Sequence, residues 1–187
     1  MILNLNIGGL SGWPANRLAV CSVRPACMPS QGVFNAMRFA QKEAELEGAP
    51  FVDTVHLLLG LINEAYSSEG TDTINTGIFN FLQLRHSTVF DKAQNFAGLE
   101  ARDLANIASS WITVAAKRLF LTSARIAQGY FSPVIKPEHI LLALCKRENM
   151  SCSAYGTFIE LGIDPEELKN IIERSIRGEI LSEIGIY

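Results

Sequence analysis

The 187-residue chain lacks several features that define common classes of protein. Its longest apolar run, from Leu57 to Ile62, is too short to cross a bilayer, so no membrane span is expected. No segment has the pattern Gly-x-x-x-x-Gly-Lys-Ser/Thr that cradles nucleotide phosphates, so neither a nucleotide nor another cofactor is expected. The net charge of −3 argues against a sequence-independent grip on nucleic acid.

Cysteine and histidine patterns typical of metal sites are also missing. The four cysteines show no Cys-x-x-Cys spacing, and the three histidines are not near them in a zinc pattern. We therefore expect no metal and free thiols in a reducing compartment. Cys145 lies on an apolar helical face and is expected in the core.

Acidic residues are absent before Glu43, and the opening segment has no helical or strand period. Residues 1–32 carry Arg17 and Arg24 among serines, prolines and glycines, a composition typical of organelle transit peptides. We interpret this segment as a targeting leader, with a disordered N-terminal tail as the alternative.

What is present is a motif that occurs twice. The segment 56–61 reads His-Leu-Leu-Leu-Gly-Leu, and the segment 139–144 reads His-Ile-Leu-Leu-Ala-Leu, a shift of 83 positions. The same shift aligns Ala44 with Ala127 and Pro50 with Pro133. The duplication indicates two copies of one structural unit, so that function belongs to the pair and the surface between them.

Apolar residues at helical spacing follow each other through the body of the chain, with glycine and proline at the breaks. The pattern predicts an all-α fold, an eight-helix bundle of two four-helix repeats related by a pseudo-twofold axis. The first repeat is predicted over 33–98, with its fourth helix over 87–97, and the second over 113–178. Residues 99–112 form the predicted link and 179–187 the C-terminal tail.

The repeated unit resembles the Clp N-terminal repeat. In the second copy the resemblance rests on Ala-Lys-Arg-Leu at 116–119, Pro-Glu-His-Ile-Leu-Leu-Ala-Leu at 137–144 and Leu-Gly-Ile-Asp at 161–164. The first copy has diverged and reads Thr-Val-His-Leu-Leu-Leu-Gly-Leu at 54–61. The resemblance extends over about residues 33–178.

In this family the double repeat is usually the N-terminal domain of Clp AAA+ unfoldases, where it recruits adaptors and substrates. A double repeat behind a transit-like leader resembles the plastid ClpT proteins. The resemblance implies a non-catalytic accessory and assembly subunit of a plastid Clp protease, which docks on the ClpP/ClpR-type core in the chloroplast stroma. The alternative is a stand-alone adaptor or substrate-recognition module that works with a Clp AAA+ chaperone, in the plastid or in the cytoplasm.

The repeated motif invites a catalytic interpretation, which its surroundings do not favour. No nucleophile is placed beside His56 or His139 by local spacing, and no acidic partner recurs in both copies. We therefore expect no enzyme activity and assign both histidines a structural role at helix starts. The same structural role is assigned to the motif leucines, which are Leu58, Leu59, Leu61, Leu141, Leu142 and Leu144.

Three residues of the second copy are candidates for partner binding. The resemblance implies that Glu138 corresponds to a glutamate that receives phosphoarginine in ClpC-type domains, whereas the first copy has Val55 there. The alternative for Glu138 is a carboxylate favoured by the helix dipole. Tyr130 and Phe131 lie in the loop before the motif, where exposed aromatic side chains often anchor partners. Packing in the core is the alternative for both.

Overall fold

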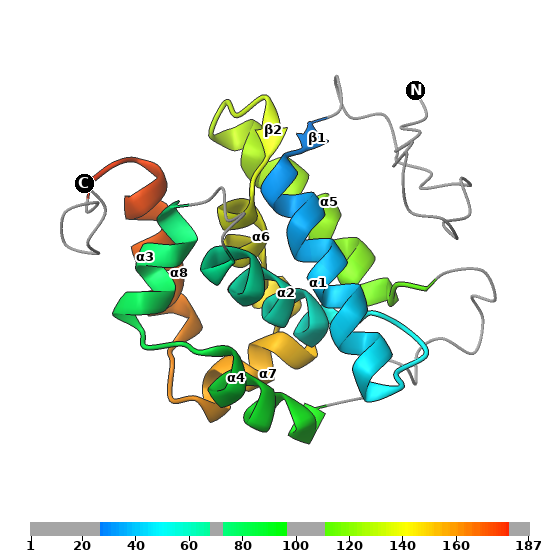
Figure 1. The fold of residues 1–187 in the computed structure, drawn as a ribbon. Coiled ribbons are helices and arrows are strands. Elements are labelled where there is room, and N and C mark those ends of the chain that lie inside the picture. Colours follow the sequence, from blue (N-terminus) through cyan, green and yellow to red (C-terminus); the bar gives the residue numbers. More distant parts are fainter. Residues whose placement is uncertain (1–26, 68–72, 97–110, 180–187) are drawn as a thin grey trace.

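The structure is a computed structural model that describes residues 27–67, 73–96 and 111–179. Within these residues it contains eight α-helices, two short strands and two 3-10 turns, so the predicted all-α fold is confirmed (Figure 1). The first half has β1 (Met28–Pro29), α1 (Gln31–Glu47), α2 (Thr54–Tyr66), α3 (Thr73–Phe81), α4 (His86–Ala93) and η1 (Gln94–Phe96). The second half has α5 (Val114–Gly129), β2 (Val134–Ile135), α6 (Pro137–Leu144), η3 (Arg147–Asn149), α7 (Ser153–Glu160) and α8 (Pro165–Ile176).

The two halves interlock through helices that occupy equivalent places. Helix α2 packs against α7 of the other half, and its counterpart α6 packs against α3. The same exchange relates the pair α4 and α7 to the pair α3 and α8, which Figure 1 shows side by side. Because each repeat covers apolar helices of the other, neither half would bury its own core alone.

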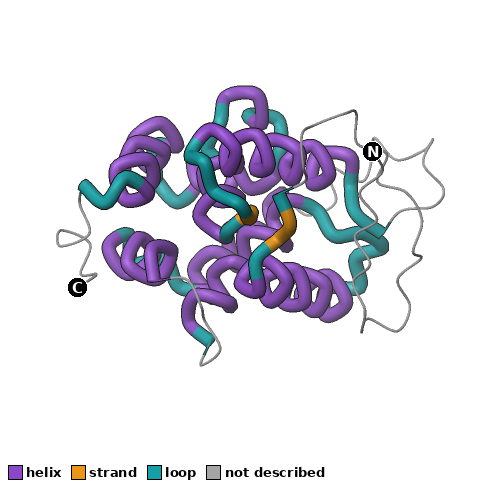
Figure 2. Tube along the Cα trace, turned by 90° about the horizontal axis from the view of Figure 1, so that it is seen from above, coloured by secondary structure: helices purple, strands orange, loops and turns teal. Residues whose placement is uncertain are grey.

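Extended segments that precede helices also join the two repeats. Strand β1, ahead of α1, pairs in parallel with β2, ahead of α6, and the two lie side by side in Figure 2. A second parallel bridge joins Val52, ahead of α2, to Ile112, ahead of α5. Each bridge therefore links one repeat to the other, as expected for a pseudo-twofold arrangement.

The folded body begins before the boundary predicted from sequence. Residues 28–32 were assigned to the leader, yet β1 pairs with β2 and the Ser30 side chain accepts a hydrogen bond from the N–H of Val33 at 3.4 Å. The Ser30 N–H also donates to the carbonyl of Ile135 at 2.8 Å. A strand of two residues is too short for the alternation of apolar and polar residues to be recognised in the sequence.

Some predicted boundaries in the first repeat also differ from the structure. The fourth helix, predicted over 87–97, is α4 followed by η1, which ends at Phe96. Helix α4 begins after Arg85, whose side chain makes no capping hydrogen bond, so the sequence carries no start signal there. Residue 97 of the predicted helix, the predicted end of the repeat at residue 98, and residues 99–110 of the link lie outside the described residues.

The core is centred on the two helices that carry the repeated motif. Nearly every residue of α2 and all residues of α6 are buried. Fully or almost fully buried are the motif leucines Leu58, Leu59, Leu61, Leu141, Leu142 and Leu144. The third helices contribute Phe79 and Phe158, both 0% exposed. The repeated apolar pattern therefore builds the interior shared by both halves.

Helices α1 and α2 approach each other so closely at Gly60 that a side chain at this position would not fit. A Cβ atom added to Gly60 would lie 2.2 Å from the carbonyl oxygen of Ala36 and 2.9 Å from the backbone nitrogen of Ala40. The equivalent position of α6, by the shift of 83, is Ala143. The first repeat thus needs glycine where the second accommodates alanine.

Candidate functional site

The two motif histidines complete the first turns of α2 and α6. The Nδ1 atom of His56 accepts a hydrogen bond from the N–H of Asp53 at 3.1 Å, and the Asp53 carboxylate accepts in return from the N–H of His56. In the second repeat, Nδ1 of His139 accepts from the N–H of Lys136 at 3.0 Å. Each ring therefore satisfies a backbone donor that the helix leaves unpaired.

The partner on the other side of each ring differs between the repeats. The Nε2 atom of His56 lies 3.2 Å from a carboxylate oxygen of Glu47. The ring of His139 instead stacks on Tyr130, with 6.4 Å between the ring centroids. Glu47 and Tyr130 are equivalent under the shift of 83, so one position supplies a charge in the first repeat and an aromatic ring in the second.

These surroundings move the two histidine pKa values in opposite directions. Burial lowers the pKa of His56, but the carboxylates of Asp53 and Glu47 outweigh burial and raise it above the ordinary value of 6.5. A proton on Nδ1 would replace the hydrogen bond accepted from the Asp53 N–H by one donated to Asp53 Oδ1, which lies 2.8 Å away. Burial and the nearby Lys136 ammonium lower the pKa of His139 to about 4. The second histidine is therefore neutral at physiological pH.

Glu138 is not presented to solvent. The residue is 2% exposed, and one carboxylate oxygen lies 3.5 Å from the Lys136 ammonium. The other oxygen, Oε2, is buried without a hydrogen-bond partner among the described residues. Its counterpart Val55 is also buried, at 2% exposed. A guest cation would reach Glu138 only after the surrounding residues moved.

Tyr130 and Phe131 form the turn that ends α5, and they lie differently. The Tyr130 ring is half-buried against His139, whereas Phe131 is 94% exposed. Phe131 also has a φ of 54°, in the left-handed region that glycine normally occupies. Its N–H donates to the carbonyl of Gln128, and the N–H of Ser132 donates to the carbonyl of Ala127.

The turn that ends α1 has the same geometry with a different residue. Gly48 has a φ of 67°, and its N–H donates to Glu45, the counterpart of Gln128. The N–H of Ala49 donates to Ala44, the counterpart of Ala127. Gly48 and Phe131 are therefore equivalent, and the second repeat has an exposed aromatic residue at a position suited to glycine.

A cleft of about 700 Å³ adjoins this turn between α5 and the C-terminal part of α8. We call it the α5–α8 cleft. Its residues are Thr122, Arg125, Ile126, Gly129, Tyr130, Phe131, Leu142, Lys146, Glu148, Glu173 and Arg177. The three cations and two carboxylates in this set surround an apolar and aromatic interior. Such a mixture suits a polypeptide partner better than a small charged substrate.

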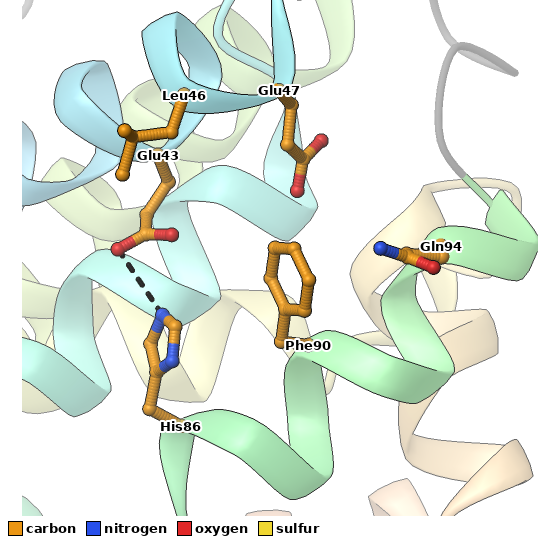
Figure 3. Close-up of a pocket in the computed structure, with 6 residues that line it drawn as sticks. All are labelled: Glu43, Leu46, Glu47, His86, Phe90 and Gln94. Carbon is orange, nitrogen blue, oxygen red and sulfur yellow. Dashed lines mark ion pairs between the residues drawn. The ribbon is translucent and has the colours of Figure 1, made fainter.

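The first repeat has a cleft at the equivalent place, between α1 and α4 (Figure 3). This α1–α4 cleft has a volume of about 640 Å³, and its residues are Glu43, Leu46, Glu47, His86, Phe90 and Gln94. The two glutamates point toward α4, where His86 and Phe90 face them. Glu43 and Glu47 stand where the second repeat has Ile126 and Tyr130, so the two clefts differ in charge.

The residues of the α1–α4 cleft were not among the candidates from sequence. A glutamate on a helix usually faces solvent, yet Glu43 is 7% exposed and lies 3.1 Å from Nε2 of His86. Asn63 also donates to Glu43 at 2.9 Å. One signal in the sequence could have indicated this cleft. The shift of 83 aligns Glu47 with Tyr130, so the helices before the two motif histidines end with different side chains.

Within the described residues, no three histidine, cysteine or acidic residues are grouped so that they could hold a metal ion. Cys145 and Cys152 are buried and form no disulfide bond within the described residues, and burial raises the pKa of the Cys145 thiol. Among the helices of residues 27–67, 73–96 and 111–179, none is both long and apolar enough to cross a membrane.

Comparison with known proteins identifies what the fold resembles. The family model described as "Clp repeat (R) N-terminal domain" matches residues 28–155. Comparison with curated protein sequences found no match.

Among solved structures, the N-terminal domain of the caseinolytic protease associated chaperone ClpD from Arabidopsis thaliana is 24% identical. The match covers 80% of this chain and 95% of that one, with a TM-score of 0.56. The Hsp104 N-terminal domain from Candida albicans is 18% identical over 81% of this chain and 93% of that one, with a TM-score of 0.56. A structure from a study of a malarial protein secretion system is also 18% identical, over 82% and 97%, with a TM-score of 0.55.

Proposed function

This chain belongs to the Clp repeat N-terminal domain family, and from that premise we propose that it is a non-catalytic protein-binding subunit. More specifically, we propose an accessory and assembly subunit of a plastid Clp protease that docks on the ClpP/ClpR-type proteolytic core. Its mechanism is association through a surface, without covalent chemistry. The plastid part of the proposal is supported by the composition of residues 1–32, which lack acidic residues and resemble a transit peptide.

The proposed binding role depends mainly on one observation, the exposed side chain and left-handed backbone of Phe131. A bulky residue in the left-handed region costs about 1–2 kcal/mol relative to glycine at the same position. Phe131 recovers none of this cost by packing, since its side chain is 94% exposed. Backbone strain at an exposed aromatic residue points to a contact made with another molecule.

The rest of the α5–α8 cleft supports a polypeptide as that other molecule. Tyr130 and Ile126 provide an apolar floor beside Phe131, and Arg125 provides charge at the same cleft. Protein interfaces commonly combine an aromatic and apolar centre with a polar rim, and they are enriched in tyrosine, phenylalanine and arginine. We therefore place the proposed docking surface at this cleft.

Capture of partners from plastid stroma tests the proposal. The tagged protein should co-purify with the ClpP/ClpR-type core, and Phe131→Gly should reduce the recovered core about tenfold or more, in the range of an interface hot spot. Phe81→Ala is the matched control, because Phe81 is an exposed aromatic residue on α3 at 56% exposure. Equal recovery with both variants would contradict docking through Phe131.

The same experiment separates the second candidate function. A stand-alone adaptor or substrate-recognition module would capture a Clp AAA+ chaperone or its clients without the core. The structural likeness to an N-terminal domain of the chaperone ClpD favours keeping this candidate. Recovery of the chaperone alone would establish the adaptor role and exclude the accessory role.

Localisation has its own test. Residues 1–32 fused to a fluorescent reporter should direct the reporter to plastids if the proposed leader is a transit peptide. A diffuse cytosolic signal would contradict the plastid assignment while leaving the proposed protein-binding role intact.

A further inference from the structure

The α1–α4 cleft is not used by the docking surface proposed above, and its chemistry is different. Helices α1 and α4 both pack on α2, and the cleft lies between them. Residues at helical spacing face each other across it, with Glu43 and Glu47 on α1 opposite His86 and Phe90 on the α4 side (Figure 3). The geometry is that of a groove with one anionic wall and one largely aromatic wall.

The anionic wall has no strong cation of its own. None of the six described residues that line the cleft is lysine or arginine. Glu43 Oε1 accepts a hydrogen bond from Asn63 and lies 3.1 Å from Nε2 of His86. Glu47 Oε2 lies 3.2 Å from Nε2 of His56. Within the described residues, the hydrogen bonds and ion pairs of both carboxylates involve only these oxygens, which leaves Glu43 Oε2 and Glu47 Oε1 able to accept further hydrogen bonds.

The apolar parts of the cleft fit a long side chain that ends in a cation. Leu46 is 72% exposed beside the two carboxylates, and the Phe90 ring stacks on His86 with 5.8 Å between the ring centroids. An aliphatic stem can lie on leucine, while a planar guanidinium can stack on an aromatic face and donate to two carboxylates. Lysine has the charge but lacks the plane and the fork of donors.

We propose that the α1–α4 cleft binds an arginine side chain presented by a partner polypeptide, with Glu43 and Glu47 as the anionic partners and Leu46 and Phe90 as the apolar surface. The proposal rests on the proposed function only in that the ligand is a polypeptide. Charge complementarity favours a cationic occupant, because the cleft has two carboxylates and no lysine or arginine among its lining residues. The pseudo-equivalent α5–α8 cleft has Ile126 and Tyr130 at the positions of the two glutamates and does not share this preference.

Fluorescence anisotropy with short labelled peptides tests the cleft directly on the full chain. The probes are Ala-Leu-Arg-Leu-Ala, the same peptide with citrulline in place of arginine, and the same peptide with lysine. Citrulline keeps the shape of arginine but has no charge. We expect the arginine peptide to bind about tenfold more tightly than the citrulline peptide, the effect of one charged hydrogen bond, and the lysine peptide to lie between them.

Variants of the cleft assign the binding to its residues. Glu47→Gln should weaken the arginine peptide about tenfold, and Leu46→Ser should weaken all three peptides by a similar factor without affecting the fold, because Leu46 is exposed. The matched control is Glu45→Gln, an exposed glutamate on the same helix outside the cleft. Thermal melts verify that each variant remains folded.

Several results would overturn this inference. They are equal affinity for the arginine and citrulline peptides, no measurable binding of any peptide, or unchanged affinity in a folded Glu47→Gln variant. Self-association of the protein that Glu47→Gln abolishes would identify a second copy as the occupant and would also overturn it. Loss of core capture by Phe131→Gly with no arginine-peptide binding would leave the proposed function standing and reject the arginine site alone.

Discussion

At the end of its first helix, the first repeat has Glu47 and Gly48, whereas the second has Tyr130 and Phe131. The backbone hydrogen bonds of the two turns are equivalent, and so is the role of each histidine at the start of the next helix. The side chains give the first turn a contact between Glu47 and the buried His56, and the second an aromatic stack beside an exposed phenylalanine. Duplication has kept the scaffold and changed the surface.

The difference shows where a duplicated fold is free to diverge. The motif leucines lie in the interior that both halves share, so a change in one copy would leave a cavity against the other. Residues at the helix-ending turns lie at the edge of this interior, and their side chains differ between the repeats while the backbone hydrogen bonds are equivalent. We therefore expect partners to bind at these turns, with a different ligand for each repeat.

The largest effects should come from the shared scaffold and should be equal in the two repeats. Leu58→Ala and Leu141→Ala each remove a side chain that is 0% exposed, and each should lower the free energy of unfolding by about 4 kcal/mol. Urea denaturation measures both. The control is Leu121→Ala, at a position 41% exposed, which should cost well under half as much. A large inequality between Leu58 and Leu141 would break the equivalence of the two halves.

A slightly smaller effect should distinguish the close helix contact of the first repeat. Gly60→Ala places a methyl group against the backbone of α1 and should lower the free energy of unfolding by about 3 kcal/mol. Ala143→Gly at the equivalent position should cost less, about 2 kcal/mol, through helix propensity and one lost buried methyl group. Denaturation curves that place the two variants together would contradict the close approach at Gly60.

The two histidines should give opposite dependences of stability on pH. Because the folded pKa of His139, about 4, lies below the unfolded value near 6.5, neutral His139 contributes stability above pH 6.5. This contribution is lost as the pH falls from 6.5 to 4, because the unfolded chain takes up the proton first. Between pH 7 and pH 4, His139→Gln should therefore lose about 2 kcal/mol less stability than the wild type.

The folded pKa of His56 is raised, so the sign reverses. Its protonated ring contributes stability that is fully present below the unfolded value of 6.5 and is lost as the pH rises through the folded pKa. The wild type should gain stability relative to His56→Gln as the pH falls from 8 to 6. Denaturant titrations at each pH measure both variants, and parallel profiles would contradict the opposite pKa shifts of His56 and His139.

The smallest expected effect concerns the left-handed residue of each turn. Phe131→Gly should raise the free energy of unfolding by about 1 kcal/mol, because it relieves the strained φ and removes no packed side chain. Gly48→Ala should lower it by about the same amount. Opposite shifts in melting temperature would show that Phe131 is kept at a cost in stability. No gain for Phe131→Gly would remove the strain argument.

Much of the helical layout was accessible from sequence because its causes are local. Asp53 belongs to the residue types preferred immediately before a helix, and its side chain caps α2. Gly48 ends α1 in the left-handed conformation, and Asp164 with Pro165 begins α8, as the composition of those segments predicts. The resemblance to the Clp N-terminal repeat is confirmed by the match over residues 28–155.

The candidate surface was only partly accessible from sequence. Tyr130, Phe131 and Glu138 are near neighbours in the chain, but Phe131 is exposed while Glu138 is buried. Helical periodicity could not separate them, because all three lie in or beside a turn. The assignment of a partner-binding role to each of them stays a prediction. Glu43 and Glu47 were passed over, because a charged residue on a helix usually faces solvent.

The duplication and the order of the helices can be predicted from the sequence, because helix starts, stops and apolar periods depend on residues a few positions apart. Which side chains meet is set by the packing of elements that are distant in the chain. His56 meets Glu47 across nine positions of chain, Glu43 meets His86 across two helices, and β1 meets β2 from the other repeat. Such contacts depend on how helices cross and how closely they approach, which no local pattern specifies.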